Sequence, residues 1–182
     1  MRMGLRQCAH SLIETLVALM VVSIVLSQGV PAMTQMVATV RLRAGMTAMM
    51  TALRLARYEA IRRNARVVVC KSADGKACAS EGGWEQGWLV FFDDNDNLMI
   101  DADEVVLYIE SAMPGNLRIT GNAPVSDYLS YTANGRAKLV SGAFQAGTLT
   151  LCQPSSKPTP AYQVIINLIG NPRVEKKLLP SC

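Results

Sequence analysis

The stretch His10–Met33, HSLIETLVALMVVSIVLSQGVPAM, decides how this chain is interpreted. Between Thr15 and Leu26 it has no charged residue and consists mainly of Leu, Val, Ile, Met and Ala. A transmembrane helix needs about 20 predominantly apolar residues, and this stretch is long enough. We therefore expect residues 10–33 to form one helix that spans a membrane, followed by a domain outside the bilayer.

A secretory signal peptide is the alternative interpretation of the same region. The leader at residues 1–9, MRMGLRQCA, is basic, an apolar core follows it, and the small residues Ser27 and Gly29 would suit cleavage after Gly29. Glu14 argues against this interpretation, because a carboxylate within the apolar layer costs about 2.5–3.5 kcal/mol. Such an acid usually has a partner and a function.

The segment AHSLIE at residues 9–14, with the apolar helix after it, resembles the class III signal of type IV pilins and pseudopilins. Cleavage by a prepilin peptidase after Ala9 would make Glu14 the fifth mature residue and Pro31 the twenty-second, where that family has an acid and a helix-kinking proline. The resemblance implies that the new amine of His10 is methylated and that Glu14 pairs with this amine on a neighbouring subunit. Such pairing would offset the cost of burying the charge and would set the subunit register. We therefore expect Glu14 and Pro31 to act in assembly.

Length and charge limit the function of the remaining chain. The 182 residues suit one ordinary domain plus an anchor. Loss of Arg2 and Arg6 with the leader would lower the formal net charge from +4 to +2, which is too little for bulk charge to indicate nucleic-acid binding. The only histidine is His10, and no nucleophile–base pair, phosphate loop or metal-ligand pair is evident. We therefore do not expect an enzyme.

Four cysteines would remain after the leader and its Cys8 are removed, namely Cys70, Cys78, Cys152 and Cys182. An even number in an exported domain predicts a disulfide framework, and three connectivities are open. Cys70 and Cys78 bracket the turn-rich loop KSADGKA, which favours local pairing. A bond between Cys152 and Cys182 would tie the end of the chain to the sheet. Zinc is disfavoured because CxxC spacing and nearby His ligands are missing.

Two kinds of periodicity divide the rest of the chain. Residues 34–64 continue the helix with one apolar face, and the charged residues lie largely off this face, which comprises Met46, Met49, Met50, Leu53, Ala56 and Ala60. Across residues 65–182, short β-branched and aromatic runs alternate with Gly, Pro, Asn, Ser and Asp, which predicts antiparallel strands joined by hairpins. A helix followed by strands predicts an α+β fold, with the long helix packed on an antiparallel β-sheet.

Three further segments resemble the GspH/FimT family of minor pilins and type II secretion pseudopilins, namely LRLARYEAIRRNARVVVCKSADGKAC, WEQGWLVFFDDNDNLMIDADE and YTANGR. The resemblance implies a pilin-like fold and a subunit that assembles into, or primes, a type IV pilus. It also implies a single-pass inner-membrane protein with its head in the periplasm. Its partners would be other pilins or pseudopilins, the prepilin peptidase and the assembly platform. A type II secretion pseudopilin and a membrane-anchored periplasmic binding domain outside any filament remain alternatives.

The acidic loop Asp93–Glu104 has oxygen-bearing side chains at positions 1, 3, 5, 9 and 12 of a calcium-loop register, namely Asp93, Asn95, Asn97, Asp101 and Glu104. Position 6, which is normally Gly, is Leu98, and the flanking residues resemble strands rather than helices. We therefore favour a polar loop that joins two strands. We therefore expect no cofactor, and calcium binding by this loop stays a hypothesis.

The tail GNPRVEKKLLPSC, at residues 170–182, contains the basic residues Arg173, Lys176 and Lys177. It partly resembles the Gly-Arg-x-Arg pattern of family members linked to natural transformation. Gly170 and Arg173 match that pattern, whereas Asn171 replaces its first Arg. Basic side chains can bind phosphates without sequence preference, so DNA is a candidate partner. We favour the alternative, a solvated strand end held by Cys182.

Overall fold

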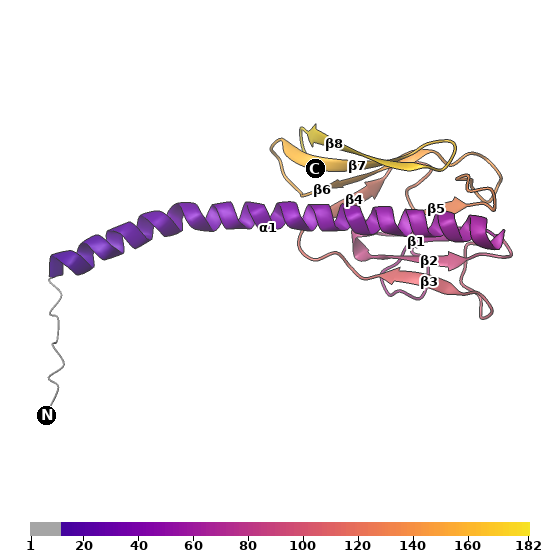
Figure 1. The fold of residues 1–182 in the computed structure, drawn as a ribbon, viewed down its shortest axis with the longest axis horizontal. Helices are drawn as coiled ribbons and strands as arrows, with labels where there is room; N and C mark the ends of the chain where they lie inside the picture. The colour runs from indigo at the N-terminus through magenta and orange to yellow at the C-terminus, as the bar shows by residue number, and fades with distance from the viewer. Residues whose placement is uncertain (1–11) are drawn as a thin grey trace, which may run out of the picture. The chain divides into compact units, whose positions relative to one another are not determined.

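The computed structural model describes residues 12–182, so the expected cleavage site at Ala9 and His10 lies outside the described residues. One long helix, α1, runs from Leu12 to Arg63, and eight strands follow it in the described chain (Figure 1). The chain divides into two compact units, Met1–Thr39 and Val40–Cys182. We describe each unit by itself and call the second one the head.

In the first unit, α1 is helical from Leu12 to Thr39. The hydroxyl groups of Thr15, Ser23 and Ser27 each donate a hydrogen bond to the carbonyl oxygen three residues earlier, at 2.9, 2.8 and 2.8 Å. These bonds satisfy the few hydroxyl groups of an apolar segment within the helix itself. Within residues 12–182, we find no helical stretch whose length and apolar character suffice to span a bilayer, so the expected span over residues 10–33 is not confirmed.

In the head, the remaining part of α1 presents the predicted apolar face to the core. Met49, Leu53, Ala56 and Ala60 are completely buried, because their spacing of three and four residues places them on one side of the helix. The helix ends at Arg63, and the next residue, Asn64, has a left-handed φ of 53°. The amide of Ala65 then donates to the carbonyl of Ala60 at 3.3 Å, which is the hydrogen bond of a Schellman C-cap.

Two antiparallel sheets of four strands each pack with this part of α1. The first has the order β3-β2-β1-β5, and its strands are β1 (Val67–Lys71), β2 (Trp88–Phe92), β3 (Val106–Glu110) and β5 (Tyr128–Tyr131). A short 3-10 helix, η1 (Trp84–Gln86), precedes β2. All residues of β1 and β2 are buried, because one face contacts the core with α1 and the other face contacts a smaller apolar cluster.

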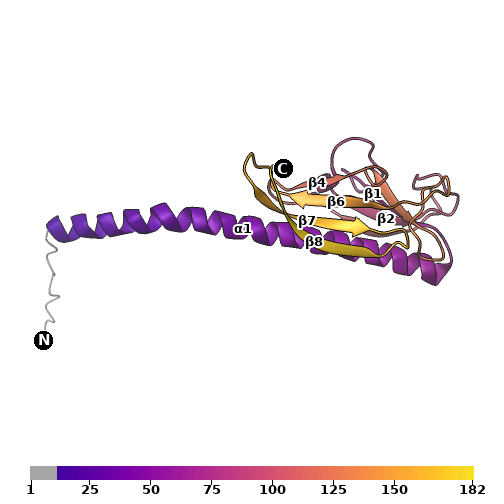
Figure 2. The same cartoon turned by 90° about the horizontal axis from the view of Figure 1, so that it is seen from above.

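The second sheet has the order β4-β6-β7-β8. Its strands are β4 (Arg118–Gly121), β6 (Gly147–Cys152), β7 (Thr159–Ile166) and β8 (Pro172–Leu179). Leu149, Leu151, Val164 and Ile166 of this sheet belong to the same core as the helix residues, and Figure 2 shows β7 and β8 running across the head part of α1. The fold is therefore α+β, with a long helix packed on antiparallel sheets, as the sequence predicted.

Two disulfides close the loops of the head. Cys70, in β1, bonds to Cys78, and Cys152, at the end of β6, bonds to the last residue, Cys182. This is the connectivity in which the turn-rich loop pairs locally. The second bond holds the C-terminal end of the chain against the second sheet, which limits fraying there.

Candidate functional site

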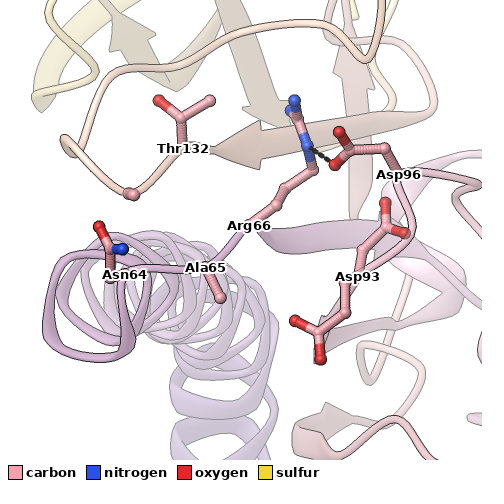
Figure 3. Close-up of a pocket in the computed structure, with 8 residues that line it drawn as sticks. Asn64, Ala65, Arg66, Asp93, Asp96 and Thr132 are labelled. Carbon is pink, nitrogen blue, oxygen red and sulfur yellow. Dashed lines mark hydrogen bonds and ion pairs between the residues drawn. The ribbon is translucent and has the colours of Figure 1, made fainter.

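A polar network in the head surrounds Arg66, which lies three residues after the end of α1. Its guanidinium forms an ion pair with Asp96 and donates to the Ser130 hydroxyl at 2.9 Å and to the Lys138 carbonyl at 3.2 Å. Figure 3 shows this arginine reaching from the helix end towards Asp96. The cavity beside it has a volume of about 350 Å³ and is lined by Asn64, Ala65, Arg66, Asp93, Asp94, Asp96, Thr132 and Ala133. Arg66 is the one basic residue among these eight lining residues, and it is already paired with Asp96.

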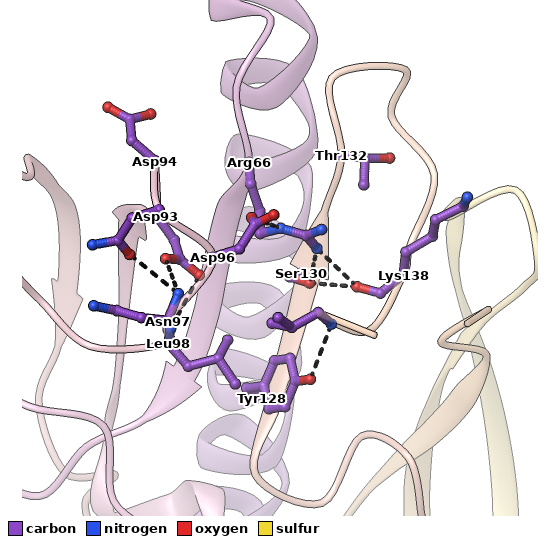
Figure 4. A network of polar contacts seen from close by, with 12 residues as sticks. Arg66, Asp93, Asp94, Asp96, Asn97, Leu98, Tyr128, Ser130, Thr132 and Lys138 are labelled. Atoms are coloured by element: carbon purple, nitrogen blue, oxygen red, sulfur yellow. Dashed lines mark hydrogen bonds and ion pairs between the residues drawn. The ribbon is translucent and has the colours of Figure 1, made fainter. Parts of the chain in front are cut away.

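Asp93 fixes the start of the acidic loop between β2 and β3. Its buried carboxylate accepts hydrogen bonds from the backbone amides of Asn97 at 2.9 Å and Leu98 at 3.3 Å (Figure 4). Burial raises the pKa of the Asp93 carboxyl above its usual range, and the two amide donors oppose that rise. Leu98 has a left-handed φ of 61° and packs on the smaller apolar cluster together with Ile100. The loop therefore covers the outer face of the first sheet.

The five residues of the calcium-loop register lie within one hydrogen-bonded loop. Asp101 accepts from the side-chain amides of Asn95 and Asn97 at 2.7 and 2.9 Å. Glu104 accepts from the backbone amides of Asp94 and Asp101 at 3.0 and 3.2 Å. Within residues 12–182, no three His, Cys, Asp or Glu side chains are grouped as a metal site requires. Strands β2 and β3 flank the loop, which agrees with the polar-loop interpretation.

We expect calcium at millimolar concentration to leave the melting temperature of the full-length chain in detergent unchanged. The reason is that the carboxylates of Asp93, Asp101 and Glu104 already accept N–H donors within the loop. Thermal unfolding with calcium and with a chelator measures this. A calcium-dependent rise in melting temperature that Asp101→Asn removes would contradict the expectation and establish a calcium site.

A buried lysine is the main polar feature that the sequence reasoning missed. Lys71, at the end of β1, is almost completely buried, and its ammonium contacts the Asp127 carboxylate at 2.7 Å. It also donates to the carbonyls of Ser80 and Gly82, at 2.9 and 3.0 Å. The Lys71 ammonium holds the pKa of Asp127 below its usual range. A lone Lys ending the apolar run VVVC was the available signal, because a buried lysine needs a partner.

Removing this ion pair should have a pH-dependent effect on stability. The folded pKa of Asp127 is lowered from 3.8, so its contribution is complete above that value and is lost as the pH falls through the folded pKa. We expect Asp127→Asn to be destabilising at about pH 6 and to approach wild-type stability at a pH below the folded pKa of Asp127. Urea unfolding at both pH values measures the difference, with Asp103→Asn, an exposed acid outside this pair, as the control. An equal loss at both pH values would contradict the assignment.

Glu59 is buried beside the core, whereas the sequence pattern predicted that the charged residues of the helix lie off its apolar face. It is 9% exposed, and its carboxylate accepts from Arg62 at 2.7 Å and from Arg63 at 3.2 Å. The Arg62 hydrogen bond lowers the pKa of Glu59. Arg63 also lies over the ring of Phe92, 4.3 Å from its centre. These arginines therefore serve the helix end, where positive charge stabilises the helix dipole.

The basic residues of the tail lie on the edge strand β8, and they do not form one patch. Successive side chains of a strand point to opposite faces, so Arg173 and Lys177 lie on one face and Lys176 lies on the other. Lys176 is paired in register with Tyr162, and Arg173 forms an ion pair with Glu175 at 3.3 Å. The tail is thus a strand end held by a disulfide, and only two of its three cations share a face.

Glu14 and Pro31 both lie within the first unit, in α1. Glu14 is in the first turn of the helix. The role that we expect for both residues requires a second subunit, so it stays a prediction.

Comparisons with known proteins agree with this architecture. The family model described as type II transport protein GspH matches residues 46–170. The type IV minor pilin FimU of Pseudomonas aeruginosa superposes with a TM-score of 0.54 at 20% identity, over 78% of this chain and 94% of that one. The minor pseudopilin EpsH of Vibrio cholerae superposes with a TM-score of 0.51 at 14% identity, over 74% and 96%. A search of curated proteins gave no match.

A long helix with a β-rich head defines a pilin-like protein, and the two structural likenesses show that fold. The family match extends over more than half of the chain. The chain therefore belongs to the GspH family, described as type II transport protein GspH.

Proposed function

We propose that this chain is a minor subunit of a type IV pilus, which leaves the inner membrane to enter or prime the filament. The GspH-family match over residues 46–170 supports a filament subunit of this kind, and the likeness to the type IV minor pilin FimU favours a pilus. On this proposal, the apolar part of α1 packs against the helices of neighbouring subunits. The prepilin peptidase first removes the leader and methylates the amine of His10, and the assembly platform then moves the subunit into the filament.

Glu14 would supply the register of that packing. A single carboxylate in apolar surroundings is costly unless a positive charge meets it. The amine of His10 on a neighbouring subunit would be such a charge, and it keeps its positive charge after methylation. The acid has a fixed position along the helix axis. The charge pair can therefore form in only one axial alignment of the two subunits, and this would select that register over others.

The head would present the contact surface outside the membrane. Its two disulfides suit a domain that works in an oxidising compartment. Both sheets share one core with the helix, which supports a head that enters the filament as a rigid body.

A pseudopilin of a type II secretion system is the second candidate function. It is favoured by the description of the matching family and by the likeness to EpsH. DNA uptake is a variant of the pilus proposal in which Arg173 and Lys177 would contact phosphates. Two such contacts on one strand face would bind weakly at physiological salt.

Deletion of the gene, scored for twitching motility, DNA uptake and protein secretion in parallel, tests the proposal. We expect motility to be lost and to return when the full-length chain is supplied in trans. Loss of secretion with normal motility would overturn the pilus proposal in favour of the second candidate. Loss of DNA uptake together with motility would identify a DNA-uptake pilus.

A further inference from the structure

A group of mostly exposed side chains lies where the last turns of α1 meet the turn between β7 and β8. We call it the helix–turn patch, and it comprises the exposed residues Arg54, Tyr58, Ile61, Leu168, Ile169 and Asn171 together with the half-buried Arg57 and the buried Pro172. Four of its side chains are large and apolar, and each is more than half exposed: Tyr58 61%, Ile61 52%, Leu168 57% and Ile169 56%. Tyr58 and Ile61 line one hollow with Asn171 and Pro172, and Arg57 of that hollow donates to the Ile169 carbonyl, so the helix and the turn form one surface. Exposed apolar side chains on such a surface indicate an interaction site.

Hydrogen bonds and packing within the head hold the patch in a fixed shape. The Arg57 guanidinium donates to the Gly135 carbonyl at 2.9 Å and to the Ile169 carbonyl at 3.5 Å, which fastens the β7–β8 turn to the helix. Ile61 packs closely against Gly135, because a Cβ added at Gly135 would lie 2.7 Å from the Cδ1 atom of Ile61. A patch that is already ordered loses little conformational entropy when a partner binds.

The hollow at the centre of the patch is cationic. It has a volume of about 230 Å³, and its lining contains Arg54 and Arg57 but no acidic residue. The hydrogen bonds of Arg57 go to neutral carbonyls, so its charge is not neutralised there. The nearest acid on the helix, Glu59, is held by Arg62 and Arg63. A partner that fits this hollow should therefore bring a carboxylate together with apolar side chains.

We infer that the helix–turn patch is the docking surface for an acidic and partly apolar area on the head of a neighbouring filament subunit. This inference rests on the proposed function and adds the surface and the chemistry of the partner. Tyr and Arg beside aliphatic side chains are typical of the centre of a protein–protein interface. A nucleic-acid interface is more polar and more strongly basic than this patch, where large apolar side chains outnumber arginines.

Site-specific photocrosslinking of the full-length chain in filament-producing cells tests the inference. The probe is Tyr58→p-benzoylphenylalanine, and Phe144→p-benzoylphenylalanine is the matched control, because Phe144 is also an exposed aromatic residue of the head. The other pilin or pseudopilin subunits of the same filament carry epitope tags, so that a crosslinked partner is identified by immunoblot. We expect a crosslink to a tagged subunit from position 58 that is absent from position 144.

Charge reversal supplies the second readout. Arg54→Glu should lower the position-58 crosslink by about fivefold or more, because it places like charges opposite each other. Arg118→Glu, which changes an exposed arginine of β4, should leave the crosslink unchanged. If Arg54→Glu and Arg118→Glu give equal crosslinking from position 58, the charge complementarity on which the inference depends is overturned.

Incorporation into sheared filaments is measured on the same samples to separate this inference from the proposed function. Normal incorporation without a subunit crosslink at position 58 would overturn the inference and leave the proposed function standing. A nuclease-sensitive adduct at that position would overturn it in favour of a nucleic-acid partner. Absence of the wild-type chain from the filaments would overturn the proposed function and this inference together.

Discussion

Glu14→Leu is expected to remove the full-length chain from filaments almost completely, while the head stays folded. The leucine would insert into lipid more readily than the acid, so loss of incorporation could not be a failure of membrane insertion. It would reflect the loss of a charge pair between subunits, and breaking a buried pair typically costs about 3–5 kcal/mol. A change of that size corresponds to at least about a hundredfold fall in incorporation. Immunoblots of sheared filaments measure it.

Two further variants make the Glu14 experiment specific. Ser23→Leu makes the same helix more apolar without touching the acid, and it should leave incorporation unchanged. Glu14→Asp keeps the charge on a shorter side chain and should retain part of the incorporation. Normal incorporation of Glu14→Leu would show that no subunit pairing depends on this residue, and the pilin mechanism proposed for this chain would then be wrong.

The Cys152–Cys182 disulfide is expected to contribute about 3–4 kcal/mol to the stability of the head. The estimate follows from the 30-residue separation of the two cysteines, because a longer loop loses more entropy when it is closed in the unfolded chain. The Cys70–Cys78 bond, with a separation of 8 residues, should contribute about 2–3 kcal/mol. The double Ala variant of each pair tests the order of the two effects.

Urea unfolding of the full-length chain in detergent provides the measurement. Trp84 and Trp88 are both completely buried, so their fluorescence reports the opening of the core. The Cys152→Ala/Cys182→Ala variant should unfold at lower urea than the Cys70→Ala/Cys78→Ala variant, with the same dependence on denaturant. If the two variants are equally stable, loop length is not the dominant factor in this head.

Local patterns in the sequence were sufficient for the elements of the head and for their class. The apolar residues of α1 recur every three or four positions, so Met49, Leu53 and Ala56 could be assigned to a buried face without knowing what covers them. The strands follow from short β-branched runs between turn residues, and the α+β order follows from the chain. The turn-rich loop between Cys70 and Cys78 likewise pointed to the disulfide that is observed.

Only the tertiary structure decided which distant residues meet. Asp127 neutralises Lys71 because β1 pairs with β5, and this pairing joins strands with no local signal linking them. The helix–turn patch combines residues 54–61 with residues 168–172, which lie far apart in the chain. Local propensity acts over a few residues, whereas these contacts depend on how both sheets pack with the helix. The sequence by itself therefore determined the elements and the family, and the packing determined the charged pairs and the surface that a partner would meet.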